Sequence, residues 1–203
     1  MTAPETVLQR DFYVRPTLKV ARDLIGNVLV HESHCGITTG MIVEVEAYIG
    51  ETDPACHAAT GFSFRNAPLY GPPGTAYVYL NYGVHHLFNV VTEPEGMPSA
   101  VLIRAVKPLK GLDLMRDRRC NRKLNSKKMI HETQLCCGPG NLTRAMGINL
   151  KENRIDLSGG RLFIQDCKNP PDRSVVWSRR VGISAGLDTL WRCYILDNQY
   201  VSG

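Results

Sequence analysis

Alternating hydrophobic and polar positions predict a chain built mainly of strands. β-branched and aromatic residues favour strands because they fit a pleated, half-buried surface. The strongest such pattern covers residues 40–50, and further strands are expected over 27–30, 76–80, 84–92, 99–106, 162–165 and 193–196. Apolar residues at helical spacing predict helices over 17–26, 108–119 and 139–148. Thr17 is expected to cap the first of these helices and Gly26 to end it.

Because strands follow one another with few helices between them, the pattern favours an α+β fold. We expect a single domain over residues 1–203, around a curved, mostly antiparallel β-sheet with a protruding β-hairpin and surrounding helices. Residues 75–92 would form the hairpin, with its turn at 81–83. Residues 51–74 are rich in Pro and Gly and predict a long loop of the functional kind. Residues 1–16 are expected to be a loosely ordered N-terminal segment.

Composition and charge narrow the classes of protein. Hydrophobic residues make up 43% and charged residues 21%, which argues against a disordered, collagen-like or coiled-coil chain. The sequence has no membrane-length apolar stretch and no signal core at its start, and its seven cysteines include no C-x-x-C motif. We therefore expect an intracellular protein, from a bacterial cytoplasm or a eukaryotic nucleus.

The net charge of +5 is unevenly distributed. Residues 107–128 hold nine Lys or Arg and two Asp, a local charge of +7. Clustered cations suggest a polyanionic partner such as nucleic acid, although a solvated helix and loop would explain them equally well.

The strand over 40–50 carries a candidate site, because side chains alternate between the two faces of a strand. One face would hold Ile42, Glu44, Glu46 and Tyr48. The other, wholly apolar and expected to face the core, would hold Met41, Val43, Val45 and Ala47. Two carboxylates followed by a tyrosine suggest chemistry, and the alternative is a solvent-facing strand with glutamates of no special role.

The hairpin adds aromatic residues to this pattern. Tyr77 and Tyr79 share a face, and Tyr82 falls at the turn beside Gly83. A large ring at a tight turn is poorly placed for burial, and exposed aromatic tips can wedge between stacked bases. Together with the basic segment, this favours nucleic-acid chemistry over small-molecule chemistry.

Six collinear motifs resemble the alkyladenine (3-methyladenine) DNA glycosylase family, monofunctional enzymes of base excision repair. The matching stretches are IVEVEAYIGETDPACHA (42–58), RN (65–66), PPGTAYVYLNYGVHHLFNVV (72–91), AVLIRAVKPLKGLDLMR (100–116), CGPGNLTRAMGI (137–148) and RVGI (180–183). The resemblance covers most of residues 18–196. It implies an enzyme that flips damaged purines, alkylated or deaminated, out of duplex DNA and hydrolyses the N-glycosidic bond.

The resemblance also implies the catalytic residues. Glu46 would position and deprotonate the attacking water, and Arg104 would help to hold it. Strand alternation alone leaves Glu44 equally possible. A glutamate is ionised at neutral pH and can also stabilise the cationic sugar of the transition state. No lysine stands in the matched pocket, so we expect direct hydrolysis with no cofactor and no metal.

The remaining site residues follow from the same motifs. Tyr48 and Tyr79 would enclose the extruded base, with His57 closing the pocket and Asn89 discriminating against guanine. Tyr82 would intercalate in the gap left by the flipped nucleotide, and the basic segment would bind phosphates. The expected partner is duplex DNA containing damaged purines, bound by a monomer away from membranes.

Departures from the family pattern are Phe62 in the loop before the Arg-Asn pair, Val84 after the turn glycine, and extra residues at 94–98. Two alternative functions remain. A protein that binds damaged bases without cutting would not need Glu46, and a small-molecule enzyme such as a formyl-group transferase would not need Tyr82.

Overall fold

One antiparallel sheet organises the computed structural model, which describes residues 6–120, 130–167 and 174–202. Its strands are β1 (Val28–Ser33), β2 (Gly36–Ile49), β3 (Ala76–Asn81), β4 (His85–Val91), β5 (Ser99–Lys110), β6 (Leu162–Gln165), β7 (Val175–Ser178) and β8 (Arg192–Ile195). The main path runs β3-β4-β5-β2-β1-β6, and β8 joins β2 to β7. Long β2 pairs with β5 along most of its length. On its other edge, β1 pairs with residues 36–41 of β2 and β8 pairs with residues 44–46.

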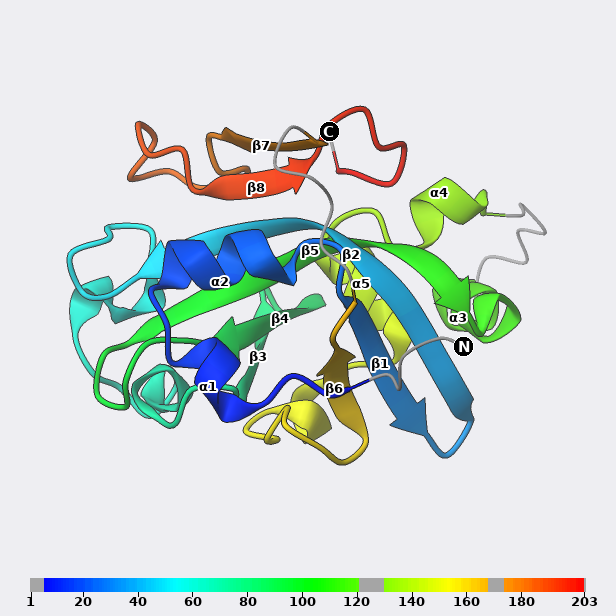
Figure 1. Ribbon diagram of the computed structural model, residues 1–203, viewed down its shortest axis with the longest axis horizontal. Coiled ribbons are helices and arrows are strands. Elements are labelled where there is room, and N and C mark those ends of the chain that lie inside the picture. The colour runs from blue at the N-terminus through cyan, green and yellow to red at the C-terminus, as the bar shows by residue number, and fades with distance from the viewer. Residues whose placement is uncertain (1–5, 121–129, 168–173, 203) are drawn as a thin grey trace.

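Short helices cover this sheet and the ends of its strands. They are α1 (Arg10–Tyr13), α2 (Thr17–Leu24), α3 (Leu112–Arg119), α4 (Glu132–Leu135), α5 (Pro139–Met146) and the 3-10 turns η1 (His57–Thr60), η2 (Ala67–Tyr70) and η4 (Leu150–Glu152). The loop 51–74 lies at one end of the molecule, and α3 and α4 lie at the other (Figure 1). The predicted α+β class, the curled antiparallel sheet and the β3–β4 hairpin are confirmed. The sequence did not indicate α1, α4 or β7.

Two packed clusters matter for the site. The main core joins residues of α2, α3, α4 and α5 to the sheet. A second, smaller cluster packs η1 and η2 against β3, β4 and β5. Tyr48, Tyr70 and Tyr79 pack on this second cluster, so the loop 51–74 is anchored beside the hairpin. In the described part of the chain, no helix is both long enough and apolar enough to cross a membrane.

The side-chain alternation of β2 changes within the strand. The register of β2 against β5 shifts on both sides of Glu44, which marks a β-bulge. Ile42 therefore shares the main core with Val45 and Ala47, whereas Val43 packs in a separate cluster. The faces expected for residues 41–43 are wrong, because a one-residue irregularity exchanges the two faces of a strand.

The helix expected over 108–119 begins later than predicted. Residues 108–110 continue β5 in pairing with β2, and Leu109 is exposed. Gly111, with φ 80°, then turns the chain into α3. Helical spacing at Leu109 is thus overridden by the hydrogen bonds of the sheet.

The start of α2 also differs from the prediction. Pro16 occupies the N-cap position, so Thr17 is not the cap. Instead, the Thr17 N–H and hydroxyl both donate to Glu93 Oε1, at 2.6 and 2.8 Å. A carboxylate from a distant loop thus satisfies the start of this helix, where negative charge is favourable.

Two buried side chains, Leu8 and Tyr13, anchor residues 6–16 to the rest of the domain. The Leu8 N–H donates to Ile164 O at 2.9 Å, and Tyr13 is fully buried. A Cβ at Gly74 would lie 2.7 Å from the Tyr13 ring, so glycine is needed at that contact. Residues 1–5 lie outside the described residues.

Candidate functional site

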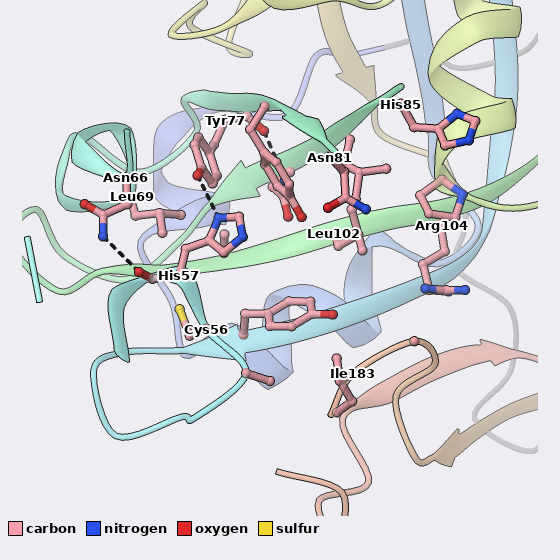
Figure 2. Close-up of a pocket in the computed structure, with 18 of the residues that line it drawn as sticks. Cys56, His57, Asn66, Leu69, Tyr77, Asn81, His85, Leu102, Arg104 and Ile183 are labelled. Atoms are coloured by element: carbon pink, nitrogen blue, oxygen red, sulfur yellow. Dashed lines mark hydrogen bonds between the residues drawn. The ribbon is translucent and has the colours of Figure 1, made fainter. Parts of the chain in front are cut away.

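A cleft of about 860 Å³ opens between the hairpin, the loop after β2, the start of α5 and residues 181–185. Figure 2 shows His57 and Tyr77 on one side of the cleft and Arg104 and His85 on another. Ile183, on the loop between β7 and β8, faces them. Six of the seven predicted site residues line it: Tyr48, His57, Tyr79, Tyr82, Asn89 and Arg104.

Glu46 lies beneath this cleft, in contact with three of its lining residues. Past the bulge, alternation along β2 places Glu46 and Tyr48 on one face, and the Tyr48 hydroxyl donates to Glu46 Oε2 at 2.8 Å. Arg104 Nη1 lies 3.2 Å from the same oxygen, and the Val181 N–H donates to Oε1 at 2.7 Å. The Glu46 side chain is fully buried, which excludes the alternative of a solvent-facing strand.

The surroundings at the floor of the cleft keep Tyr48 protonated and Arg104 cationic. Burial, followed by the charge and hydrogen bond of Glu46, raises the pKa of Tyr48, so its hydroxyl remains a donor. Burial alone would lower the pKa of Arg104, but the carboxylates of Glu46 and Glu44 outweigh it and the pKa is raised. Arg104 therefore stays cationic beside Glu46.

An aromatic wall forms one side of the cleft. The ring centroids of Tyr77 and Tyr79 are 5.3 Å apart, and those of His57 and Tyr79 are 4.4 Å apart. His57 Nδ1 lies 2.8 Å from the Tyr77 hydroxyl (Figure 2). Burial raises the pKa of Tyr77, whereas burial and then the charge of Arg65 lower that of His57. A protonated Tyr77 hydroxyl and a neutral imidazole therefore share this hydrogen bond.

Asn66 and Asn89 brace this wall. Asn66 Nδ2 donates to the His57 and Gly61 carbonyl oxygens, at 2.9 and 2.8 Å. Asn89 faces Tyr77 across the β3–β4 ladder and donates to the Tyr77 carbonyl oxygen at 3.1 Å. The sequence indicated Asn89 but assigned no role to Asn66, although the Arg-Asn pair was the signal.

Sequence reasoning missed a buried ion pair behind the cleft. Arg180 binds Asp53 through two hydrogen bonds, at 2.6 and 2.8 Å, and both side chains are fully buried. The guanidinium carbon lies 4.7 Å from the Tyr48 ring centroid and 5.0 Å from that of Trp191. Burial favours the neutral form of Asp53, but the bonds from Arg180 outweigh it, so the pKa of Asp53 is lowered. The pair supports Tyr48 from behind, and its signal was the RVGI motif.

The hairpin tip presents Tyr82 to solvent. Its side chain is 91% exposed, and Tyr82 and Gly83 have φ values of 47° and 70°. Three residues, 82–84, separate the paired Asn81 and His85, and the Val84 N–H donates to the Asn81 carbonyl oxygen at 3.0 Å. A positive φ is uncommon for a bulky residue such as Tyr82. Such local strain at an exposed ring is consistent with a functional position.

The basic segment contributes to structure as well as to charge. Arg118 donates to the Ala145 and Met146 carbonyl oxygens, and Arg119 to those of Gln134 and Leu135. These arginines hold the last turns of α5 and α4, where cations are favourable. Four of the nine basic residues of this segment, at 122, 123, 127 and 128, lie outside the described residues.

Comparison with known proteins identifies the class. The family model described as methylpurine-DNA glycosylase (MPG) matches residues 11–199. A protein of Chlorobium phaeobacteroides (strain BS1), named "Putative 3-methyladenine DNA glycosylase", is 46% identical over 198 residues, covering 97% of this chain and 95% of the relative. Proteins of the same name from Prosthecochloris aestuarii and Carboxydothermus hydrogenoformans are 47% and 44% identical, covering 95% and 97% of this chain and 89% and 98% of each relative.

Fold, cleft and matches together define a DNA-repair glycosylase, a hydrolase acting on N-glycosyl bonds. The chain belongs to the methylpurine-DNA glycosylase family. The family resemblance carried by the six motifs is therefore confirmed. Across the described residues, no group of three or more His, Cys, Asp or Glu could hold a metal ion.

Proposed function

We propose that the protein is a monofunctional glycosylase of base excision repair. It flips alkylated or deaminated purines out of duplex DNA and hydrolyses the N-glycosidic bond, leaving an abasic site. The observation that carries this proposal is the buried Glu46 carboxylate, 3.2 Å from Arg104 Nη1, beneath a cleft walled by Tyr48 and Tyr79. Family membership supports the same chemistry.

Glu46 activates the attacking water in this proposal. A carboxylate offers about four acceptor positions, and the Tyr48 hydroxyl, the Arg104 guanidinium and the Val181 N–H use three of them. The fourth can accept a hydrogen bond from water, whose oxygen bonds to the sugar as the N-glycosidic bond breaks and its electron pair passes to the purine. A cationic purine leaves as the neutral base, whereas a neutral purine such as hypoxanthine must also take up a proton as it leaves. The water proton passes to Glu46, and the carboxylate charge stabilises the cationic sugar as the bond breaks.

Tyr48, together with Tyr79 of the aromatic wall, selects the base. Many alkylated purines are cationic, and the faces of Tyr48 and Tyr79 attract cations by about 0.5–2 kcal/mol. A positive charge also makes the purine a better leaving group. Asn89 lines the cleft and would disfavour normal guanine at the position of the exocyclic amine of the base, a cost that the attraction between the tyrosine faces and a cationic alkylated guanine offsets. His57 closes the pocket.

Tyr82 lowers the cost of extrusion. Flipping a nucleotide costs a few kcal/mol, least where pairing is already weak. The exposed ring at the hairpin tip would occupy the gap that the nucleotide leaves.

We expect a monomer acting on duplex DNA inside the cell, with no cofactor.

A panel of duplexes, each bearing one damaged purine, tests the proposal. We expect free base and abasic sites from alkylated-purine and hypoxanthine duplexes, none from an undamaged duplex, and strand breaks only after alkali treatment. Tight lesion binding without base release would instead identify a damage-binding protein. Neither binding nor release would refute the proposed function.

A further inference from the structure

Glu44 is a buried carboxylate that the proposed mechanism does not use. Its side chain is fully buried, yet it does not line the cleft. Oε1 accepts from Arg104 Nε at 2.9 Å and from Arg192 Nε at 2.7 Å. Oε2 accepts from the Ser202 N–H and hydroxyl, at 2.7 and 2.6 Å. Four donors thus saturate a carboxylate that lies directly behind Arg104.

The contacts of Glu44 determine how the Arg104 guanidinium is oriented. Arg104 presents Nε to Glu44, Nη2 to the Ser202 hydroxyl at 3.2 Å and Nη1 to Glu46 Oε2 at 3.2 Å. Because a guanidinium is planar and rigid, fixing Nε and Nη2 also fixes the direction of Nη1. Glu44 and Ser202 therefore aim Arg104 at Glu46.

Glu44 also balances charge behind the cleft. The connected network contains two carboxylates, Glu44 and Glu46, and two guanidiniums, Arg104 and Arg192. The neighbouring Arg180–Asp53 pair is neutral by itself. Without the charge of Glu44, the network would carry one net positive charge at the site expected to receive a cationic base.

We propose that Glu44 is a positioning residue for excision of cationic purines, holding Arg104 toward Glu46 and cancelling its positive charge. This inference rests on the proposed function. It predicts that the charge of Glu44 and its geometry affect different measurements, since charge changes the preference among lesions and geometry changes the rate for all of them.

Single-turnover excision of 7-methylguanine, a cationic base, and of hypoxanthine, a neutral base, separates the two effects. For each variant we compare the maximal rate divided by the half-saturating enzyme concentration. Glu44→Gln should slow both reactions at least about 10-fold, because misplaced groups cost roughly this much or more. It should slow 7-methylguanine release by about 10-fold more than hypoxanthine release, since a net positive charge repels the cationic base.

Charge-restoring variants provide the sharpest test. Glu44→Asp keeps the charge but shortens the reach, so both rates should fall while their ratio stays as in the wild type. Arg192→Gln should shift the ratio toward 7-methylguanine. Combining Glu44→Gln with Arg192→Gln should restore the wild-type ratio, although the rates stay low. Glu152→Gln is the matched control, because Glu152 is buried and ion-paired to Arg161 but does not line the cleft.

The outcomes separate the two proposals. If the wild type releases no base, the proposed function is refuted and this inference with it. If the wild type is active and Glu44→Gln matches it, or loses both reactions in equal proportion, only the inference is overturned. Should Glu44→Gln fail to fold, the ratio measured for Arg192→Gln decides the matter, and an unchanged ratio overturns the inference.

Discussion

Replacing Glu46 by Gln tests the central step of the proposed reaction. The amide is close in size to the carboxylate, but it carries no charge and one end can only donate. Its oxygen can still accept the Val181 N–H, which places the amide nitrogen beside Arg104 Nη1, 3.2 Å away in the wild type. A charge-assisted contact worth about 1.5–3 kcal/mol is then lost.

The expected losses differ between catalysis and stability. General-base catalysis contributes at least about 10²-fold, so Glu46→Gln should raise the barrier by at least about 2.7 kcal/mol. The free energy of unfolding should fall by about 2 kcal/mol, because Arg104 retains Glu44 as a partner. Single-turnover excision at saturating enzyme isolates the chemical step, and fluorescence anisotropy on a hypoxanthine duplex measures affinity.

The reasoning would be refuted by a Glu46→Gln protein that excises at the wild-type rate. A slower variant whose whole loss lay in DNA affinity would also refute it. Glu152→Gln controls for general destabilisation, because Glu152 is a buried carboxylate in η4 that pairs with Arg161. This variant should retain the wild-type rate.

Three further predictions follow from the exposed tip, the buried ion pair and His57. Tyr82→Ser should weaken binding to a lesion duplex by about 10-fold while changing the free energy of unfolding by less than about 0.5 kcal/mol, because the ring is exposed; equal affinity in both proteins would contradict the wedge role. Arg180→Met should lower the free energy of unfolding by about 3–5 kcal/mol in urea titration, since it leaves the Asp53 carboxylate buried and unpaired; a loss below about 1 kcal/mol would show that the pair contributes little. Burial and then the charge of Arg65 hold the pKa of His57 below its ordinary value of about 6.5. As the pH falls through that value, His57 gains a proton in the unfolded chain but not in the folded chain, so the free energy of unfolding falls. His57→Gln should therefore lose less melting temperature than the wild type between about pH 7.5 and 5.5, and an equal or larger loss would count against this linkage.

Local patterns were enough to predict much of this fold. Alternation located both strands of the hairpin, because β3 and β4 pair with each other across a short turn. The centre of β2 was located by its run of β-branched residues, although its partners β5 and β8 are distant in the chain. The prediction failed where distant pairing decided the outcome. Residues 108–110 have helical spacing but remain in β5, because β2 supplies their hydrogen-bond partners. The start of α2 likewise depends on Glu93, which is remote in sequence.

For the site, the sequence by itself determined the side chains and their order: a strand with two carboxylates, a tyrosine-bearing hairpin and the motifs of a glycosylase family. Strand alternation could not distinguish Glu44 from Glu46, because a period of two makes them equivalent, and only the family resemblance indicated Glu46. The tertiary structure shows how the surroundings of the two carboxylates differ. The Val181 N–H and the Tyr48 hydroxyl hold Glu46 beneath the cleft, whereas Ser202 and Arg192 hold Glu44 behind Arg104. Three of these donors, Val181, Ser202 and Arg192, come from chain segments more than a hundred residues away, and only folding brings such segments together.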